Sequence, residues 1–317
     1  MKTVYLNKFM SSVVAELEMN GQYGTAHVCG SVLRSVMAFD GEGLPVSGIT
    51  PLWLKAYEGY LLHKGGKGLA WNTVSTYMRM LQAVYNRAVV RKLAAFIPHQ
   101  FRDVFTGRKA DHRRVLERDD MQKLLVERDP DITSPGMAWA RACLELMFRF
   151  HGMPFVDLAH LRKSDLKDGY LTLRRRKTGM PLSARVDGRA MQLLERYRNR
   201  DDTSPYLLCF LDGNLEGMAA YRDYQRILRL LNSRLRALAL WKKVQGKVTS
   251  YSARHTWATV GRYCHIPIEV ISEGLGHASV TTTEGYMKGF GNSRMDRANK
   301  VIMNYIFKGL SNAVDKW

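Results

Sequence analysis

The 317-residue chain has few cysteines, no long apolar run and no apolar segment near its first residue. Its four cysteines are Cys29, Cys143, Cys209 and Cys264, which lie far apart without a C-x-x-C pair. This spacing argues against a disulfide framework or a zinc site and favours a reducing cytoplasm. No apolar stretch approaches the roughly 20 residues that span a bilayer. The N-terminal residues also lack the apolar core of a signal peptide. We therefore expect a cytoplasmic protein that does not bind a membrane.

Negative charge is also scarce. The chain has 48 Lys and Arg residues against 29 Asp and Glu residues, which gives a formal net charge of +19. Such an excess attracts polyanions, so nucleic acid is the expected partner. The length and the 46% content of hydrophobic residues predict two globular domains.

Residues 1–104 are predicted to form a helical domain. Apolar residues between Asn72 and Lys92 recur with a 3.6-residue period, and Asn72 is a candidate N-cap. Another helix is expected over residues 51–62, with Pro51 in its first turn. The helix that follows Asn72 carries four cations, Arg79, Arg87, Arg91 and Lys92. They are candidates for contact with DNA phosphates, and the alternative is that they only form a solvated surface.

Residues 105–115 are basic and aperiodic, which is typical of a linker, and residues 116–317 are predicted to form a second domain. Asp119 or Asp120 is a candidate cap for its first helix. Further helices are expected over residues 137–151, from Pro154, and over residues 221–240, 253–264 and 297–307. A strand over residues 169–177, a turn at Thr178-Gly179 and a return over residues 180–186 predict a hairpin. The expected fold is mainly α with one small sheet, in the α+β class.

One short segment of the second domain concentrates reactive groups. It reads Ala253-Arg254-His255-Thr256-Trp257-Ala258-Thr259, then Leu275-Gly276-His277, then Tyr286. Cleavage of a phosphodiester without a metal requires fixed cations, a group that moves a proton and a nucleophile. A guanidinium, an imidazole and a phenol supply these three functions.

These residues resemble the signature of the tyrosine recombinase (phage integrase) family, R-H-T-x-A-T followed by L-G-H and a nucleophilic Tyr. His277 precedes Tyr286 by the family's nine positions. The resemblance implies a SAM-like core-binding domain, a linker and a catalytic domain that close on double-stranded DNA as a C-shaped clamp. It also implies that Tyr286 forms a 3′-phosphotyrosine and releases a 5′-hydroxyl, with no ATP, metal or other cofactor.

The resemblance assigns further catalytic roles. Arg254 would hold a phosphate through its planar fork of donors. His277 would either hydrogen-bond a non-bridging oxygen or accept the proton of Tyr286. Lys177 would protonate the leaving 5′-oxygen, with a solvated hairpin charge as the alternative. Tyr251 stands where the family motif H-x-x-R begins with His, and it would act as a phosphate ligand.

The first arginine of the family is missing. The pattern G-L-R-x-x-E-L aligns with residues 152–158, so Pro154 replaces the Arg while Asp157 keeps the acidic position. Loss of such a donor typically costs on the order of 10²–10³ in rate. Either the enzyme is inactive or another cation replaces this arginine.

Strand alternation identifies the candidate. Residues two apart share a face, so Arg175 and Lys177 are predicted to point inward together. Arg174 and Arg176 would point to the other face, toward DNA. Arg175 is the expected substitute, with Arg149 in reserve.

The missing Arg resembles a branch of the family that includes phase-variation invertases and transposon integrases. The helical domain begins almost at the first residue, without room for an arm-binding domain, so we expect a simple two-domain invertase or resolvase. The alternatives are a mobile-element integrase, a type IB topoisomerase and a catalytically silent DNA-binding protein. Intact Arg254 and Tyr286 argue against the silent protein.

The expected partner is DNA with paired inverted-repeat sites, in a bacterial cytoplasm where the bound protein associates with the nucleoid. The resemblance also implies a homotetramer linked by exchange of a C-terminal helix. That helix carries an apolar stripe of Val301, Ile302, Tyr305 and Ile306. The stripe would dock on the neighbouring protomer, and the alternative is packing against its own domain.

Overall fold

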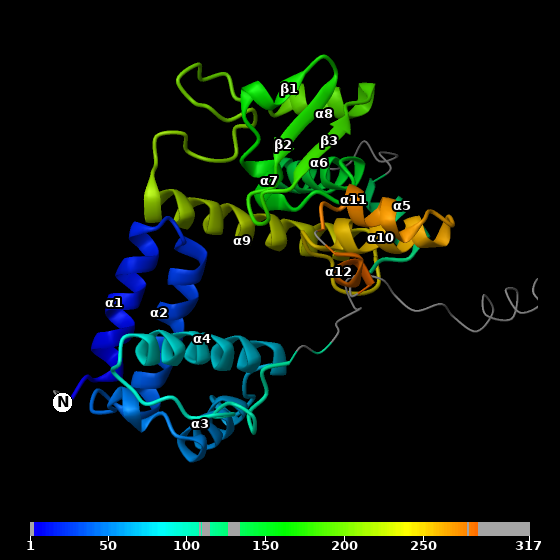
Figure 1. The fold of residues 1–317 in the computed structure, drawn as a ribbon. Helices are drawn as coiled ribbons and strands as arrows, with labels where there is room; N and C mark the ends of the chain where they lie inside the picture. Colours follow the sequence, from blue (N-terminus) through cyan, green and yellow to red (C-terminus); the bar gives the residue numbers. More distant parts are fainter. Residues whose placement is uncertain (1–2, 108, 110–114, 126–133, 278, 285–317) are drawn as a thin grey trace, which may run out of the picture. The chain divides into compact units, whose positions relative to one another are not determined.

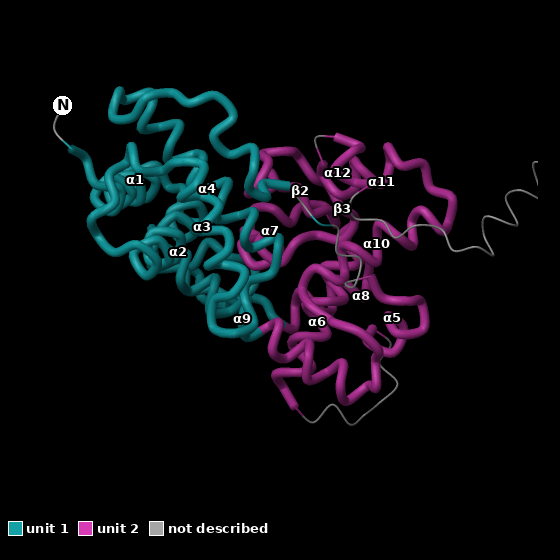
Figure 2. Tube along the Cα trace, turned by 90° about the horizontal axis from the view of Figure 1, so that it is seen from below, with its two compact units in different colours: residues 1–111, 197–230 teal, residues 112–196, 231–317 magenta. Residues whose placement is uncertain are grey.

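The computed structural model describes residues 3–107, 109, 115–125, 134–277 and 279–284. Contacts group the chain into two compact units, residues 1–111 with 197–230 and residues 112–196 with 231–317 (Figure 2). The predicted fold class is confirmed, because the described part is mainly helical with a three-stranded antiparallel sheet (Figure 1). The domain boundaries inferred from the sequence stay a prediction.

The first unit is built around four helices: α1 (Leu6–Met19), α2 (Tyr23–Asp40), α3 (Pro51–His63) and α4 (Trp71–Val90). α2 packs against α1, α3 and α4, and α3 also packs against α4. The helix expected over residues 51–62 is confirmed as α3, with Pro51 in its first turn and the Thr50 hydroxyl accepting the Trp53 N–H. α4 is also confirmed, and its apolar stripe is buried in the core of the unit.

Asn72 is not the N-cap of α4. The helix begins at Trp71, and Ala70 is its N-cap without a side-chain hydrogen bond. The Asn72 amide instead donates to the carbonyl of Lys109 and accepts its N–H, both at 2.8 Å. The Lys109 ammonium lies 4.4 Å from the centre of the Trp71 ring. The cap prediction was wrong because Asn72 binds a segment that follows the helical core in sequence.

The second unit is organised around α6 (Pro135–Arg149), which buries every residue from Ala140 to Met147. A helix that is buried on all sides must lie in the centre of its unit. α6 packs against four other helices: α5 (Arg118–Leu125), α7 (Phe155–Ala159), α8 (Gly188–Arg196) and α10 (Ser252–Tyr263). α11 (Ile268–Gly274) packs against α10, and α12 (Val280–Glu284) packs against α11.

α9 (Gly217–Trp241) contributes its first part to the first unit and its last part to the second. Two predictions of helix starts were wrong by one turn or less. Pro154 is the N-cap of α7 and not its first residue. Asp119 and Asp120 lie inside the first turn of α5.

The sheet has the order β1 (Leu166–Lys167), β2 (Tyr170–Arg174) and β3 (Pro181–Arg185). In the register of β2 with β3, Leu171 lies opposite Ala184 and Leu173 lies opposite Leu182. Leu171, Ala184 and Leu182 are buried, so one face of the sheet covers the core.

The predicted hairpin exists, but β2 ends at Arg174 and does not reach Lys177. The chain turns over residues 175–179. Arg175 N–H donates to the Met180 carbonyl at 2.9 Å, and Gly179 N–H donates to the Arg175 carbonyl at 2.8 Å. Gly179 has φ +69°, a conformation that favours glycine. Lys177 therefore lies in the turn, where strand alternation no longer applies.

Candidate active site

Arg254 is the most deeply held cation of the second unit. Its side chain enters the core from α10 and the residue is only 2% exposed. Nη1 donates to the carbonyl of Gly152 at 3.0 Å, and Nη2 donates to the carbonyl of Leu275 at 2.6 Å. Gly152 has φ +67°, and a Cβ there would lie 2.9 Å from the Cα of Arg254. Glycine therefore lets this loop pass close enough for its carbonyl to accept the arginine.

Arg175 reaches the same place from the hairpin. It is 6% exposed, its Nε lies 3.2 Å from Oδ2 of Asp157, and its Nη1 donates to the carbonyls of Leu275 and Gly276. Oδ1 of Asp157 accepts the N–H of Arg176 at 2.9 Å. One buried carboxylate on α7 thus fixes both the side chain of Arg175 and the start of the turn. Within the described residues, Nη2 of Arg175 has no hydrogen-bond partner.

The carbonyl of Leu275 brings the two arginines together, because both donate to its oxygen. Gly276 follows with φ +61°, and a Cβ on it would collide with the side chain of Arg175. Asp157 pairs with Arg175, whereas Arg254 contacts the carbonyls of Gly152 and Leu275 and the imidazole of His277. These three contacts of Arg254 are with uncharged groups, so they leave its positive charge in place beside Arg175.

His277 completes the cluster. Its Nε2 lies 2.8 Å from Nη2 of Arg254, and its Nδ1 lies 2.8 Å from Oγ1 of Thr283. Burial, and then the positive charges of Arg254, Arg175 and Lys177, lower the pKa of His277 to about 4. The imidazole is therefore neutral at pH 7.

Lys177 is exposed in the hairpin turn and makes no hydrogen bond or ion pair with the rest of the described chain. Its charge is one of those that lower the pKa of His277, so it acts on the same cluster. Arg174 and Arg176 have exposed side chains, and Arg174 donates to the Gly179 carbonyl at 3.2 Å.

Tyr251 is the N-cap residue of α10 and is exposed, with its ring centre 6.3 Å from that of His255. Tyr286 and the apolar stripe from Val301 to Ile306 lie outside the described residues. The structure thus brings Arg254, Arg175 and His277 into one cluster and leaves the predicted nucleophile undescribed.

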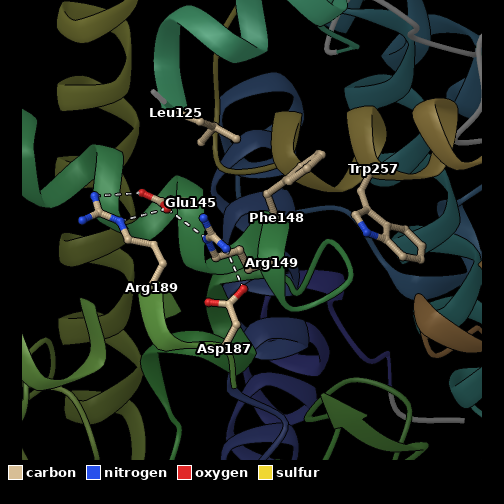
Figure 3. Close-up of a pocket in the computed structure, with 7 residues that line it drawn as sticks. All are labelled: Leu125, Glu145, Phe148, Arg149, Asp187, Arg189 and Trp257. Carbon is tan, nitrogen blue, oxygen red and sulfur yellow. Dashed lines mark hydrogen bonds and ion pairs between the residues drawn. The ribbon is translucent and has the colours of Figure 1, made fainter. Parts of the chain in front are cut away.

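Arg149, the reserve cation, lies in a different environment. Its Nε is 2.9 Å from Oε1 of Glu145 and its Nη1 is 2.6 Å from Oδ2 of Asp187 (Figure 3). Arg189 also pairs with Glu145, at 3.2 Å. These side chains line a cavity of about 650 Å³ together with Leu125, Phe148 and Trp257. Within the described residues, the hydrogen bonds of Arg149 go to carboxylates, which neutralise its charge.

The predicted DNA-contacting cations of the first unit lie on or just after α4. Arg87 and Arg91 pair with Glu16, at 3.3 and 2.7 Å, and Arg91 lowers the pKa of Glu16. Arg79 and Lys92 are exposed without an ion pair in the described part of the chain. No carboxylate in the described part of the chain offsets the charges of Arg79 and Lys92.

Sequence reasoning missed the roles of two residues in this cluster. Nothing in the sequence distinguishes Thr283 from the two threonines before it. Leu275 belongs to the motif, but the role of its main-chain carbonyl cannot be read from its side chain. Within the described residues, no group of three or more His, Cys, Asp and Glu side chains is arranged to hold a metal ion. No helix there has both the length and the hydropathy of a membrane span.

Two family models match parts of this chain. Residues 114–290, more than half of the chain, match the phage integrase family. The chain belongs to the phage integrase family. Residues 5–102 match the phage integrase SAM-like domain.

The chain is similar to several curated proteins, including these two. It is 29% identical to tyrosine recombinase XerA of Pyrococcus furiosus over 140 residues. The aligned segment covers 43% of this chain and 46% of XerA. It is 27% identical to the putative integrase/recombinase y4gC of Sinorhizobium fredii over 180 residues. This alignment covers 55% of the chain and 88% of y4gC. The match thus spans about half the length of XerA.

Solved structures share the fold. One is a lambda integrase fragment crystallised as a dimer bound to a COC′ core site, with TM-score 0.64, 18% identity and coverage of 91% of this chain and 97% of that one. Another is the Tn1549 transposon integrase in complex with transposon right end DNA, with TM-score 0.63, 17% identity and coverage of 93% and 98%.

Proposed function

We propose that this protein is a site-specific DNA recombinase that cuts and rejoins double-stranded DNA through a 3′-phosphotyrosine at Tyr286. One observation carries the proposal. The guanidinium groups of Arg175 and Arg254 converge on the carbonyl of Leu275, beside a neutral His277. Two fixed cations with a net positive field form a suitable site for the two non-bridging oxygens of a phosphodiester.

Arg175 takes the role of the arginine that Pro154 replaces. Its Nη2 has no partner within the described residues, while Asp157 and two carbonyls fix the rest of the group. A donor that is fixed before the substrate binds needs no reorganisation during the reaction. This arrangement favours the branch of the family that lacks the first arginine and yet is active.

The reaction balances without a cofactor. The phenolic oxygen of Tyr286 forms a bond to phosphorus and gives up its proton to a base, for which His277 is the candidate. The bond from phosphorus to the 5′-oxygen breaks, and the ammonium of Lys177 protonates that oxygen. Tyr251 supplies a further hydrogen bond to the phosphate. The phosphotyrosine keeps the energy of the broken ester, so attack by a 5′-hydroxyl reverses the step and rejoins DNA.

The substrate in this proposal is duplex DNA with paired inverted repeats. The structural relatives support it, since structures of lambda integrase and of the Tn1549 integrase were solved with DNA. A lambda integrase tetramer was also solved on a Holliday junction, which supports a homotetramer here, linked by the C-terminal helix. Sequence-independent phosphate contacts would come from exposed or partly exposed cations: Arg79, Arg87, Arg91, Lys92, Arg174 and Arg176.

We favour an invertase or resolvase. Integration of a mobile element is the second candidate, because transposon and phage integrases share the fold. The two reactions are distinguished by placing the sites on one plasmid in inverted orientation or on two separate plasmids. Relaxation of a plasmid without any site would instead indicate a topoisomerase.

The direct test uses the duplexes that the purified protein retains from a random pool, rebuilt as nicked suicide substrates. The wild-type protein should form a covalent adduct on a denaturing gel. Tyr286→Phe should bind the same duplex with equal affinity and form none. An adduct with the Phe variant would assign the nucleophile elsewhere.

A further inference from the structure

His277 lies between two partners of opposite character. On one side, Nη2 of Arg254 lies 2.8 Å from Nε2. On the other side, Oγ1 of Thr283 lies 2.8 Å from Nδ1. Thr283 is fully buried in α12, only six positions after His277. This buried hydroxyl therefore faces the one imidazole in the arginine cluster.

The two contacts determine where the imidazole carries its proton. A guanidinium can only donate, so Nε2 must accept from Arg254. A neutral imidazole has one N–H, which must then be on Nδ1 and point at the Thr283 hydroxyl. Within the described residues, the charges that lower the pKa of the ring are those of Arg254 from α10 and of Arg175 and Lys177 from the hairpin, all positive, and they disfavour a second proton.

We propose that Thr283 is a positioning residue that holds His277 as the Nδ1–H tautomer, so that Nε2 is a proton acceptor. Together with the proposed function, on which this part rests, the tautomer assigns His277 one of its two possible roles. Donation from Nε2 to a non-bridging oxygen would require the opposite tautomer or a charged ring. A lone pair on Nε2 instead takes the phenolic proton of Tyr286.

The bound phosphate makes this transfer feasible. A non-bridging oxygen competes for the hydrogen that Nη2 of Arg254 gives to Nε2, which exposes the lone pair. The negative charge of the phosphate also offsets the three cations, which raises the basicity of the ring. The proton moves from the phenol to Nε2 as the bond from the phenolic oxygen to phosphorus forms, and it returns to the phenol on rejoining.

The structure offers matched variants at this position. Valine has nearly the shape of threonine but lacks the hydroxyl that accepts the Nδ1 proton. Serine keeps the hydroxyl and lacks the methyl group. An effect of hydrogen bonding should therefore appear in Thr283→Val and be largely rescued in Thr283→Ser, whereas a packing effect would appear in both.

The first measurement needs neither DNA nor activity. The full-length protein is labelled with ¹⁵N-histidine, and His277→Gln identifies the resonances of His277. At pH 7 the two ring nitrogens of the wild type should show the Nδ1–H tautomer, and Thr283→Val should shift the ring toward a mixture. A dominant Nε2–H tautomer or a charged ring in the wild type would overturn the proposal.

The second measurement is single-turnover cleavage of the suicide substrate at saturating protein. Thr283→Val should be slower by about 10²-fold, as expected for a misplaced catalytic group, with unchanged DNA affinity. Thr283→Ser should recover most of the rate. Wild-type tautomer and rate in Thr283→Val would show that Thr283 positions nothing. If the wild type shows the expected tautomer but forms no adduct, the proposed function fails while the assignment of the tautomer stands.

Discussion

Two pairs of arginines lie within the second unit, and they are held in opposite ways. Arg149 and Arg189 bind the carboxylates of Glu145 and Asp187 (Figure 3). Arg175 pairs with one carboxylate, Asp157, and both Arg175 and Arg254 donate to main-chain carbonyls.

The charge balance separates the two pairs. Two cations with two carboxylates leave no net charge to attract a phosphate. Arg254 contacts carbonyls and an imidazole, which carry no net charge, so these contacts do not neutralise it. Whether an arginine near a suspected site can bind phosphate is therefore better predicted from the charge of its partners than from its position in the sequence. On this ground we propose that Arg175, and not Arg149, replaces the arginine missing at Pro154.

The largest effect should separate Arg175→Ala from Arg149→Ala. The first variant loses a donor to the transition state, so cleavage at saturating protein should fall by roughly 10²–10³ with little change in binding. The second should cleave at nearly the wild-type rate and lose about 1 kcal/mol of unfolding free energy with its partly exposed ion pairs. Single-turnover rates and denaturant titration measure both. Equal losses of cleavage in the two variants would refute the distinction.

Arg174→Ala and Arg176→Ala serve as controls on the same hairpin. Their side chains are exposed, so they should weaken DNA binding modestly and leave the saturated cleavage rate unchanged.

A smaller effect is expected from glycine substitutions. Gly276 and Gly169 both have positive φ, +61° and +76°, so alanine should cost about 1 kcal/mol of backbone strain at either position. Only at Gly276 would the new Cβ collide with Arg175. Gly276→Ala should therefore lower cleavage about tenfold or more, while Gly169→Ala should not. If both variants retain full cleavage at saturating protein, the path of Arg175 past Gly276 is unimportant.

The smallest effect concerns protonation. In the DNA-free protein, the pKa of His277 should be about 4 by NMR titration. Removing a nearby positive charge with Arg175→Ala should raise this pKa, and Arg149→Ala should leave it unchanged. Since an unfolded histidine takes its proton near pH 6.5, the folded state should lose stability as the pH falls from there toward 4. A pKa of His277 insensitive to Arg175 would contradict the shared field.

The sequence predicted the helical fold, the hairpin and the motif residues Arg254 and His277 because these follow from periodicity and from a family signature. It also directed attention to Arg175, although β2 ends one residue earlier. What it could not supply were contacts made across the fold. Asn72 was misread as a cap because its partner, Lys109, is 37 residues away. The bond from Arg254 to Gly152 joins residues 102 apart and depends on packed helices.

The carbonyl of Leu275 has an evolutionary consequence. Every amino acid supplies the same main-chain oxygen, so genetic drift at position 275 can alter packing but cannot delete the acceptor that both arginines use. A carboxylate in its place would be lost through a single codon change. Tolerance of the site to substitution is therefore set by the backbone path, and the vulnerable position is the adjacent Gly276, where any side chain would obstruct Arg175.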